Sequence, residues 1–240
     1  MRIVFLGSSH GVPEQNRRTS CTLLEVGERR YMIDMGTQAI EQLITRGIAP
    51  DAVQAVFVTH MHGDHTNGLI SFLDLGSWYF KTVDPALYLP GDPEAIMAAA
   101  YGWLAVNGTQ KRPYRAFAVE EGLLYDDGFL RVTAYRTRHT DASFAYLVEA
   151  EGKRILFSGD LSHKPQEDFP YAAFPLDLAI CEVAHFEATA YLSIFTGEHI
   201  PGRVCFNHYN SARRMAGLCE ARAALEIPTL LATDGLEIVL

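Results

Sequence analysis

The sequence has no excess of positive charge. It contains 20 Lys and Arg residues against 29 Asp and Glu residues, which gives a formal net charge of −9. A protein that coats nucleic acid neutralises phosphates with a broad basic face, so this balance argues against that class. Lys111, Arg112 and Arg115 lie close together and leave room for a small local basic site. We therefore expect no extended nucleic-acid surface.

The sequence also lacks paired cysteines and long apolar runs. Its scattered cysteines, with no C-x-x-C pair, are Cys21, Cys181, Cys205 and Cys219. This pattern is typical of reduced core residues in a cytosolic protein. The opening run Met1–Leu6 ends at Gly7, too short for a signal peptide, and the most apolar helical stretch, Ala95–Val106, is too short to span a bilayer. We expect a cytoplasmic protein that does not contact membranes.

Hydrophobic residues are plentiful, and linkers are missing. Of the 240 residues, 48% are hydrophobic, enough for a sizeable core. No short-period repeat or low-complexity tract interrupts the chain. We expect residues 1–240 to form a single domain.

Extended segments dominate the expected secondary structure. They are Arg2–Leu6, Cys21–Val26, Tyr31–Asp34, Ala55–Val58, Leu130–Tyr135, Phe144–Ala150, Arg154–Phe157, Leu178–Cys181, Arg203–Asn207, Thr229–Ala232 and Glu237–Leu240. The expected helices are Thr37–Arg46, capped by Thr37; Ala95–Val106, begun by Asp92-Pro93-Glu94; Ala212–Leu225; and one that begins near Thr66. We expect Trp78, Tyr79 and Phe80 to be buried in the core.

One stretch, Thr59–His65, concentrates metal-binding side chains directly after the strand Ala55–Val58. His60 and His62 alternate as in an extended chain, so both rings can face the same way. Gly63 would let the chain bend, bringing Asp64 and His65 round to a second point. Two neighbouring ions accommodate these four groups better than one, and the ligand types suit borderline metals such as zinc.

Further polar residues fall just past the ends of other expected strands. They are His139, Asp160, Glu182, His185 and His208. Ligand sites in sheet proteins gather at strand ends, where loops converge. A single histidine after a strand is more often an ordinary loop residue, but two ions need ligands from elsewhere in the chain. Among them, the best-placed candidate ligands are His139, Asp160 and His208.

Together these residues resemble the metallo-β-lactamase superfamily, whose signature is H-x-H-x-D-H followed by a distant His, an Asp and a final His. The matching residues are His60, His62, Asp64, His65, His139, Asp160 and His208. Segments that look like the opening of the ribonuclease Z and phosphodiesterase branch are Phe5–Gly7, Gly11–Pro13 and Ile33–Gln38. The resemblance implies an α/β fold, a four-layer αβ/βα sandwich with metals at one edge between its halves.

The resemblance divides the seven ligands between two divalent metal ions. The implied sets are His60, His62 and His139 for the first ion; Asp64, His65 and His208 for the second; and Asp160 as the bridge. Zinc is expected first, with manganese or iron as alternatives. A hydroxide bridging the two ions would be the nucleophile, and Asp34 and Thr59 are expected to orient ligand loops or to serve as ordinary turn and cap residues.

A bridging aspartate separates branches of this superfamily. Classical β-lactamases of this fold lack it, whereas phosphodiester, thioester and lactone hydrolases use it. In ribonuclease Z, a histidine about as far before the last ligand as His185 donates a proton to the leaving alkoxide. Glu182 would orient that imidazole, so we count Asp64, His185 and Glu182 as catalytic candidates. The alternative is that His185 is an ordinary residue at the start of a helix and takes no part in proton transfer.

The sequence departs from ribonuclease Z in two places: the Glu182–His185 segment is compressed, and the segment between His139 and Asp160 is short. Only about 20 residues separate His139 from Asp160, where ribonuclease Z carries a long arm that grips transfer RNA. We therefore expect a small or cyclic phosphodiester, or a short RNA, as the substrate. The alternatives are a thioester or lactone hydrolase on the same site, or a metal-binding effector without activity. Relatives often form dimers, so a homodimer is a possible assembly. We assign no catalytic role to His10 or His163.

Overall fold

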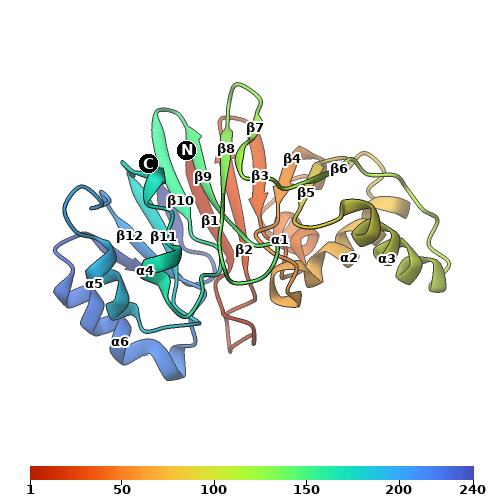
Figure 1. Ribbon diagram of the computed structural model, residues 1–240. Helices are drawn as coiled ribbons and strands as arrows, with labels where there is room; N and C mark the ends of the chain where they lie inside the picture. The colour runs from red at the N-terminus through yellow and green to blue at the C-terminus, as the bar shows by residue number, and fades with distance from the viewer.

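The computed structural model describes residues 1–240, in which two seven-stranded sheets face each other (Figure 1). The first sheet has the strand order β14-β1-β2-β3-β4-β5-β6. Its strands are β1 Arg2–Gly7, β2 Cys21–Val26, β3 Arg29–Ile33, β4 Val53–Phe57, β5 Ala86–Leu89, β6 Ala116–Ala118 and β14 Glu237–Val239. The second has the order β13-β12-β11-β10-β9-β8-β7. Its strands are β7 Gly122–Asp126, β8 Arg131–Arg136, β9 Phe144–Ala150, β10 Lys153–Phe157, β11 Leu178–Glu182, β12 Val204–Asn207 and β13 Thr229–Leu231.

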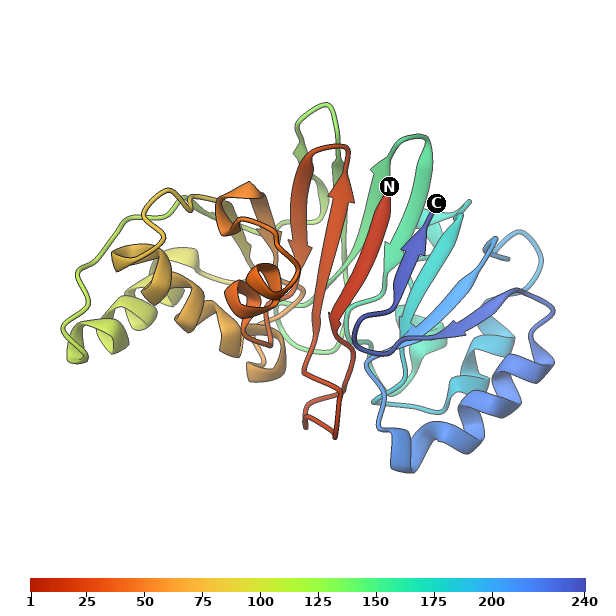
Figure 2. The same cartoon turned by 180° about the vertical axis from the view of Figure 1, so that it is seen from behind.

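Helices lie outside both sheets, as the two opposite views show (Figures 1 and 2). The helices are α1 Ala39–Thr45, α2 Gly63–Trp78, α3 Pro93–Val106, α4 Pro165–Asp168, α5 Tyr191–Ile194 and α6 Ser211–Ala224. Short 3-10 turns are Pro50–Ala52, Tyr171–Ala173 and Ala188–Ala190. Helices α1–α3 cover the first sheet, and α4–α6 cover the second. No helix combines the length and apolar character needed to cross a bilayer.

Three apolar cores separate the four layers. In β1, Ile3 and Phe5 point into the core between the two sheets, while Val4 and Leu6 point into the core beneath α1–α3. A third core lies between the second sheet and its helices α5 and α6. Strands covered on both faces need apolar side chains on both, which is why the central strands read as continuous hydrophobic runs. The predicted αβ/βα sandwich is confirmed.

The strand directions collect polar loops at one edge of the sandwich. Strands β10, β11 and β12 are parallel, so their carboxyl ends meet on the same side. Asp160 follows β10, Glu182 ends β11 and His208 follows β12. The carboxyl end of β4, in the other sheet, leads to His60.

Several expectations about the elements were wrong. Helix α2 begins at Gly63 rather than near Thr66, so Gly63 is its first residue and Asp64 and His65 lie in its first turn. Helix α1 is preceded by Gln38, without a side-chain cap from Thr37. Strands β5, β6 and β7 were not expected.

Two predictions of burial were also wrong. Trp78 and Tyr79 are 55% and 65% exposed, because they close α2 at its outer end instead of packing into the core. Cys219 is exposed on α6, whereas the other three cysteines are buried, as expected.

Candidate metal centre

Asp34 anchors the histidine-rich turn. Its Oδ1 accepts a hydrogen bond from the amide of Thr59 at 2.7 Å, and its Oδ2 lies 2.7 Å from Nδ1 of His65. The residue is buried and has a φ of 59°, a left-handed conformation that aspartate tolerates better than most side chains. Because its bond occupies Nδ1, the other ring nitrogen of His65 is left to face the site.

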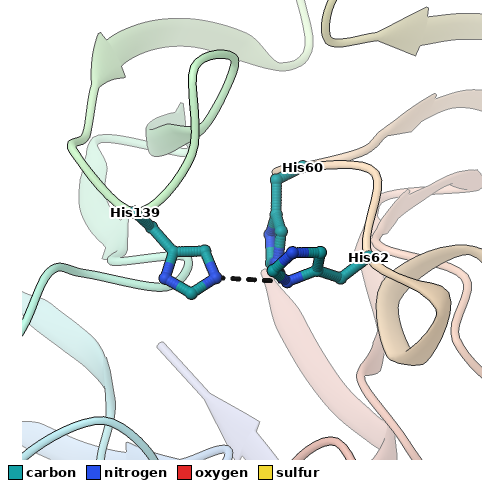
Figure 3. Close-up of side chains that lie close together, drawn as sticks. All are labelled: His60, His62 and His139. Atoms are coloured by element: carbon teal, nitrogen blue, oxygen red, sulfur yellow. Dashed lines mark hydrogen bonds between the residues drawn. The ribbon is translucent and has the colours of Figure 1, made fainter.

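Three histidines form the first group of potential ligands. Nε2 of His60 lies 3.0 Å from Nδ1 of His62, and Nε2 of His139 lies 3.2 Å from that same atom. Figure 3 shows His139 reaching the other two rings from a loop of the opposite half of the fold. That loop follows β8 of the second sheet, while His60 and His62 follow β4 of the first. The group therefore spans the two sheets.

Asp64, His65 and His208 form the second group. Oδ2 of Asp64 lies 3.4 Å from Nε2 of His65 and 3.6 Å from Nε2 of His208. Asp64 and His65 come from the first turn of α2, and His208 comes from the end of β12. Nδ1 of His208 lies 2.8 Å from the hydroxyl of Ser20, which holds the ring with Nε2 toward the carboxylate. This group also joins residues from both halves.

The Asp160 carboxylate lies between the two groups. Its Oδ2 is 3.7 Å from Nε2 of His60 and 3.7 Å from Nε2 of His139. Its Oδ1 is 3.5 Å from Nε2 of His65, and its Oδ2 is 3.3 Å from Nε2 of His208. Asp160 is buried, and a buried carboxylate needs a compensating charge, which a bound cation would supply.

These residues fit divalent metal ions. Nε2 of His65 and Oδ1 of Asp160 are buried without a hydrogen-bond partner, an arrangement that proteins rarely keep unless something else satisfies the atoms. Burial, with the charge of His65, lowers the pKa of His60 to about 2, so its ring is neutral, as a ligand must be. Imidazole nitrogens and carboxylate oxygens converging within 4.8 Å are a typical ligand set for zinc and similar ions.

A sixth histidine borders the cluster. His185 packs against His139, with ring centroids 4.5 Å apart, and its Nδ1 lies 2.9 Å from Oε1 of Glu182. Glu182 is buried and also accepts from the amide of Leu161 at 2.8 Å. Burial lowers the pKa of His185, but the hydrogen bond and charge of Glu182 outweigh it, so the pKa is raised above the ordinary 6.5.

The sequence comparison decides the family. Residues 16–215, most of the chain, match the metallo-beta-lactamase superfamily. The chain belongs to this superfamily. Membership implies divalent metal ions, for which the cluster offers ligands.

Individual relatives extend this assignment. Ribonuclease Z of Geobacillus kaustophilus (strain HTA426) is 34% identical over 152 residues, which cover 62% of this chain and 48% of the relative. Ribonuclease Z of Bacillus subtilis (strain 168) is 33% identical over 153 residues, covering 62% of this chain and 49% of the relative. The chain thus spans about half the length of the curated relatives it matches. The predicted resemblance to the ribonuclease Z branch is confirmed.

A solved structure supports the fold alone. The metallo-β-lactamase fold protein YhfI from Bacillus subtilis superposes with a TM-score of 0.78 at 18% identity, covering 99% of this chain and 98% of that one. The chain therefore has the same overall fold as YhfI, although the two sequences are only 18% identical.

The structure brings all the residues predicted for the metallo-β-lactamase site to one edge of the sandwich. Sequence reasoning missed two contributors, Ser20 behind His208 and Gly11, where an added Cβ would lie 3.5 Å from Oδ2 of Asp64. Both belong to the loop between β1 and β2, far from the histidine motif in sequence. The only signal in that loop was the family-like segment Gly11–Pro13. His163 is exposed, with Nδ1 3.0 Å from the carbonyl oxygen of His185.

Proposed function

We propose that this chain is a metal-dependent phosphodiesterase that acts on a small or cyclic phosphodiester or a short RNA. The observation that carries the proposal is the position of Asp160, whose carboxylate faces two separate groups of ligands from both halves of the fold. Such a carboxylate is suited to bridge two divalent ions, of which zinc fits these ligands best. The names of the curated relatives support phosphodiester chemistry.

The ligand roles follow the two groups. We assign His60, His62 and His139 to one ion. Asp64, His65 and His208 then hold the other. When bound, such a pair of ions supplies Lewis acidity and makes water a nucleophile near neutral pH.

The remaining chemistry belongs to the protein's own residues. Glu182 orients His185 through the 2.9 Å contact at Nδ1, which leaves Nε2 as the proton donor. Against the effect of burial, the hydrogen bond and charge of Glu182 raise the pKa of His185, which favours the protonated ring. His185 then protonates the leaving alkoxide, which is otherwise a poor leaving group. A neutral imidazole, such as that of His60, adds no positive charge to the site. The carboxylates of Asp64 and Asp160 would therefore offset part of the charge of bound ions.

Substrate size follows from the segment between His139 and Asp160. It contains only the β9–β10 hairpin, so no inserted arm is present there to hold a folded RNA. The net charge of −9 points the same way, since a protein that grips folded RNA needs a basic footprint.

The test combines metal analysis with a substrate panel. We expect about two metal ions per chain and hydrolysis of phosphodiesters. We expect His185→Ala to reduce turnover of a dialkyl or ribose phosphodiester by roughly 100-fold or more, but to change bis(p-nitrophenyl) phosphate hydrolysis little, because that leaving group needs no proton. Hydrolysis of thioesters or lactones alone would contradict the proposal, and equal loss on every phosphodiester or on none would remove His185 from its role.

A further inference from the structure

His10 lies beside the second group of ligands. The loop that carries it runs along the segment after β12, where the amide of His208 donates to the carbonyl oxygen of Ser8 at 3.2 Å. The neighbouring residue, Gly11, lies beside Asp64: a Cβ there would be in ordinary van der Waals contact with Oδ2, at 3.5 Å. The side chain of His10 is only 17% exposed. Its ring is thus held next to Asp64 and His208, whereas His185 packs against His139.

The cap of helix α6 determines which nitrogen of His10 carries the proton. Asn210 is the N-cap of α6, and its Oδ1 accepts from the amide of Arg213 at 3.0 Å. That bond fixes the orientation of the amide, so Nδ2 is the atom that lies 2.9 Å from Nε2 of His10. Because the amide nitrogen is a donor, Nε2 must accept, and the proton of the neutral ring sits on Nδ1.

No other group competes for Nε2. Oε1 of Glu14 is 3.9 Å away, beyond hydrogen-bond distance, and already accepts from the amide of Ser211 at 2.8 Å. Oε2 of Glu14 is paired with Arg17 at 2.8 Å. Because Nε2 accepts from Asn210, the ring carries a single proton, on Nδ1, and is neutral. No protein atom accepts a hydrogen bond from Nδ1.

We propose that His10 is a substrate-binding residue whose Nδ1–H donates to a non-bridging oxygen of the phosphodiester. The inference rests on the proposed function and assigns to the substrate a contact beside Asp64 and His208. A neutral donor is suited to this place, because it adds a hydrogen bond to the phosphoryl oxygen without repelling the metal ions. The loop after β1 and the cap of α6 therefore act together to aim one N–H group.

Two substitutions separate this role from a structural one. In His10→Asn the amide N–H takes the place of Nδ1–H, but the contact to Asn210 is lost. In His10→Gln the side-chain oxygen reaches the place of Nε2 and still accepts from Asn210, but the donor at the place of Nδ1–H is lost.

We expect His10→Gln and His10→Ala to lower kcat/KM for phosphodiesters by about 10- to 100-fold, the range typical of a hydrogen bond to a charged group. The loss should fall mainly on KM, since the oxygen is charged in both ground and transition states. His10→Asn should recover most of it. Wild-type kinetics in all three variants, or recovery by His10→Gln but not His10→Asn, would overturn the proposal.

A second readout does not depend on turnover. In the zinc-loaded protein, long-range ¹H–¹⁵N spectra of the histidine rings should show His10 protonated at Nδ1, with that signal shifted by added dimethyl phosphate. Asn210→Asp is the matched control, because aspartate also caps the helix but accepts from Nε2 and so moves a proton there. An Nε2–H tautomer in the wild type, or no shift with dimethyl phosphate, contradicts the inference. Failure of the proposed function would appear separately, as a wild type that hydrolyses no phosphodiester.

Discussion

At the scale of single residues, Asp34 controls the site without facing the cluster itself. It bonds the amide and hydroxyl of Thr59 and Nδ1 of His65, which fixes both the turn and the ring that follows it. Residues that hold a ligand's other nitrogen set its tautomer and are worth about 10- to 100-fold in metal affinity. The proposed orienting role of Asp34 therefore has a measurable consequence.

We expect Asp34→Asn to weaken metal binding by about 10- to 100-fold while the fold persists, because asparagine tolerates the same backbone conformation. Its Oδ1 can still accept from Thr59, but its amide faces Nδ1 of His65 and drives the proton onto Nε2, the nitrogen needed for the metal. Competition with a chromophoric chelator measures the affinity. Asp74→Asn, on the outer part of α2, is the control, and unchanged affinity in Asp34→Asn would refute the role.

Local spacing predicted four of the seven candidate ligands, whereas His139, Asp160 and His208 were predicted from their places after strands and from the family resemblance. The sequence H-M-H-G-D-H places four metal-binding side chains in one turn, and that signal is local. The contacts of Ser20 with His208 and of Asn210 with His10 were not predictable in this way, because each joins segments nearly 200 residues apart. Hydroxyl and amide side chains are also common in loops, so their types carried no signal.

At the scale of elements, helix α2 positions two candidate ligands by packing directly on backbone. The amide of Gly68 donates to the carbonyl oxygen of Met35 at 2.8 Å, and the amide of Met35 donates to that of His65 at 2.8 Å. A Cβ on Gly68 would lie 1.8 Å from the carbonyl oxygen of Thr37. No other residue permits this approach, so Gly68 sets the place of the first turn of the helix.

We expect Gly68→Ala to destabilise the protein by about 3 kcal/mol and to weaken metal binding, because the clash pushes Asp64 and His65 away from the cluster. The matched control is Gly102→Ala in α3, where an added Cβ meets nothing within 4 Å. It should instead stabilise by up to about 1 kcal/mol through helix propensity. Urea unfolding of both variants measures the difference, and equal effects would show that the close approach is unimportant.

Most elements were predictable, and the exceptions have physical reasons. Apolar alternation and glycine turns located the hairpins around Gly27 and Gly152, and Asp92 caps α3 as expected. Strands β6 and β7 lie at the sheet edges and are half-exposed, so they carry a weak hydrophobic pattern.

At the scale of the whole molecule, the two sheets are joined by a polar contact as well as by their core. Asp127, between β7 and β8, accepts from the hydroxyl of Tyr31 on β3 at 2.6 Å and from Arg29 at 2.7 Å. Burial alone would raise the pKa of Asp127. The hydrogen bonds from Tyr31 and from the amides of Leu130 and Phe129 instead lower it to about 2.

This contact predicts how stability depends on pH. A carboxylate with a depressed pKa stabilises the fold above its ordinary pKa of 3.8, and that contribution is lost as the pH falls toward 2. We expect Asp127→Asn to lower the free energy of unfolding by about 1–2 kcal/mol at pH 7, with a deficit that shrinks below pH 4. Asp126→Asn, at an exposed neighbour, should change little. A deficit independent of pH would contradict this account.

The order of the layers was not predictable from the strands alone. Their number and lengths are compatible with several sandwiches, and the αβ/βα arrangement came from the resemblance of the metal motif. What the structure adds is the convergence: seven candidate ligands from two sheets meet at one edge.

The most direct test of the account is anomalous diffraction from crystals of the zinc-loaded protein. We predict two zinc peaks about 3.5–4 Å apart, one beside His60, His62 and His139 and the other beside Asp64, His65 and His208, with Asp160 between them. A single peak, or peaks away from Asp160, would contradict the central claim.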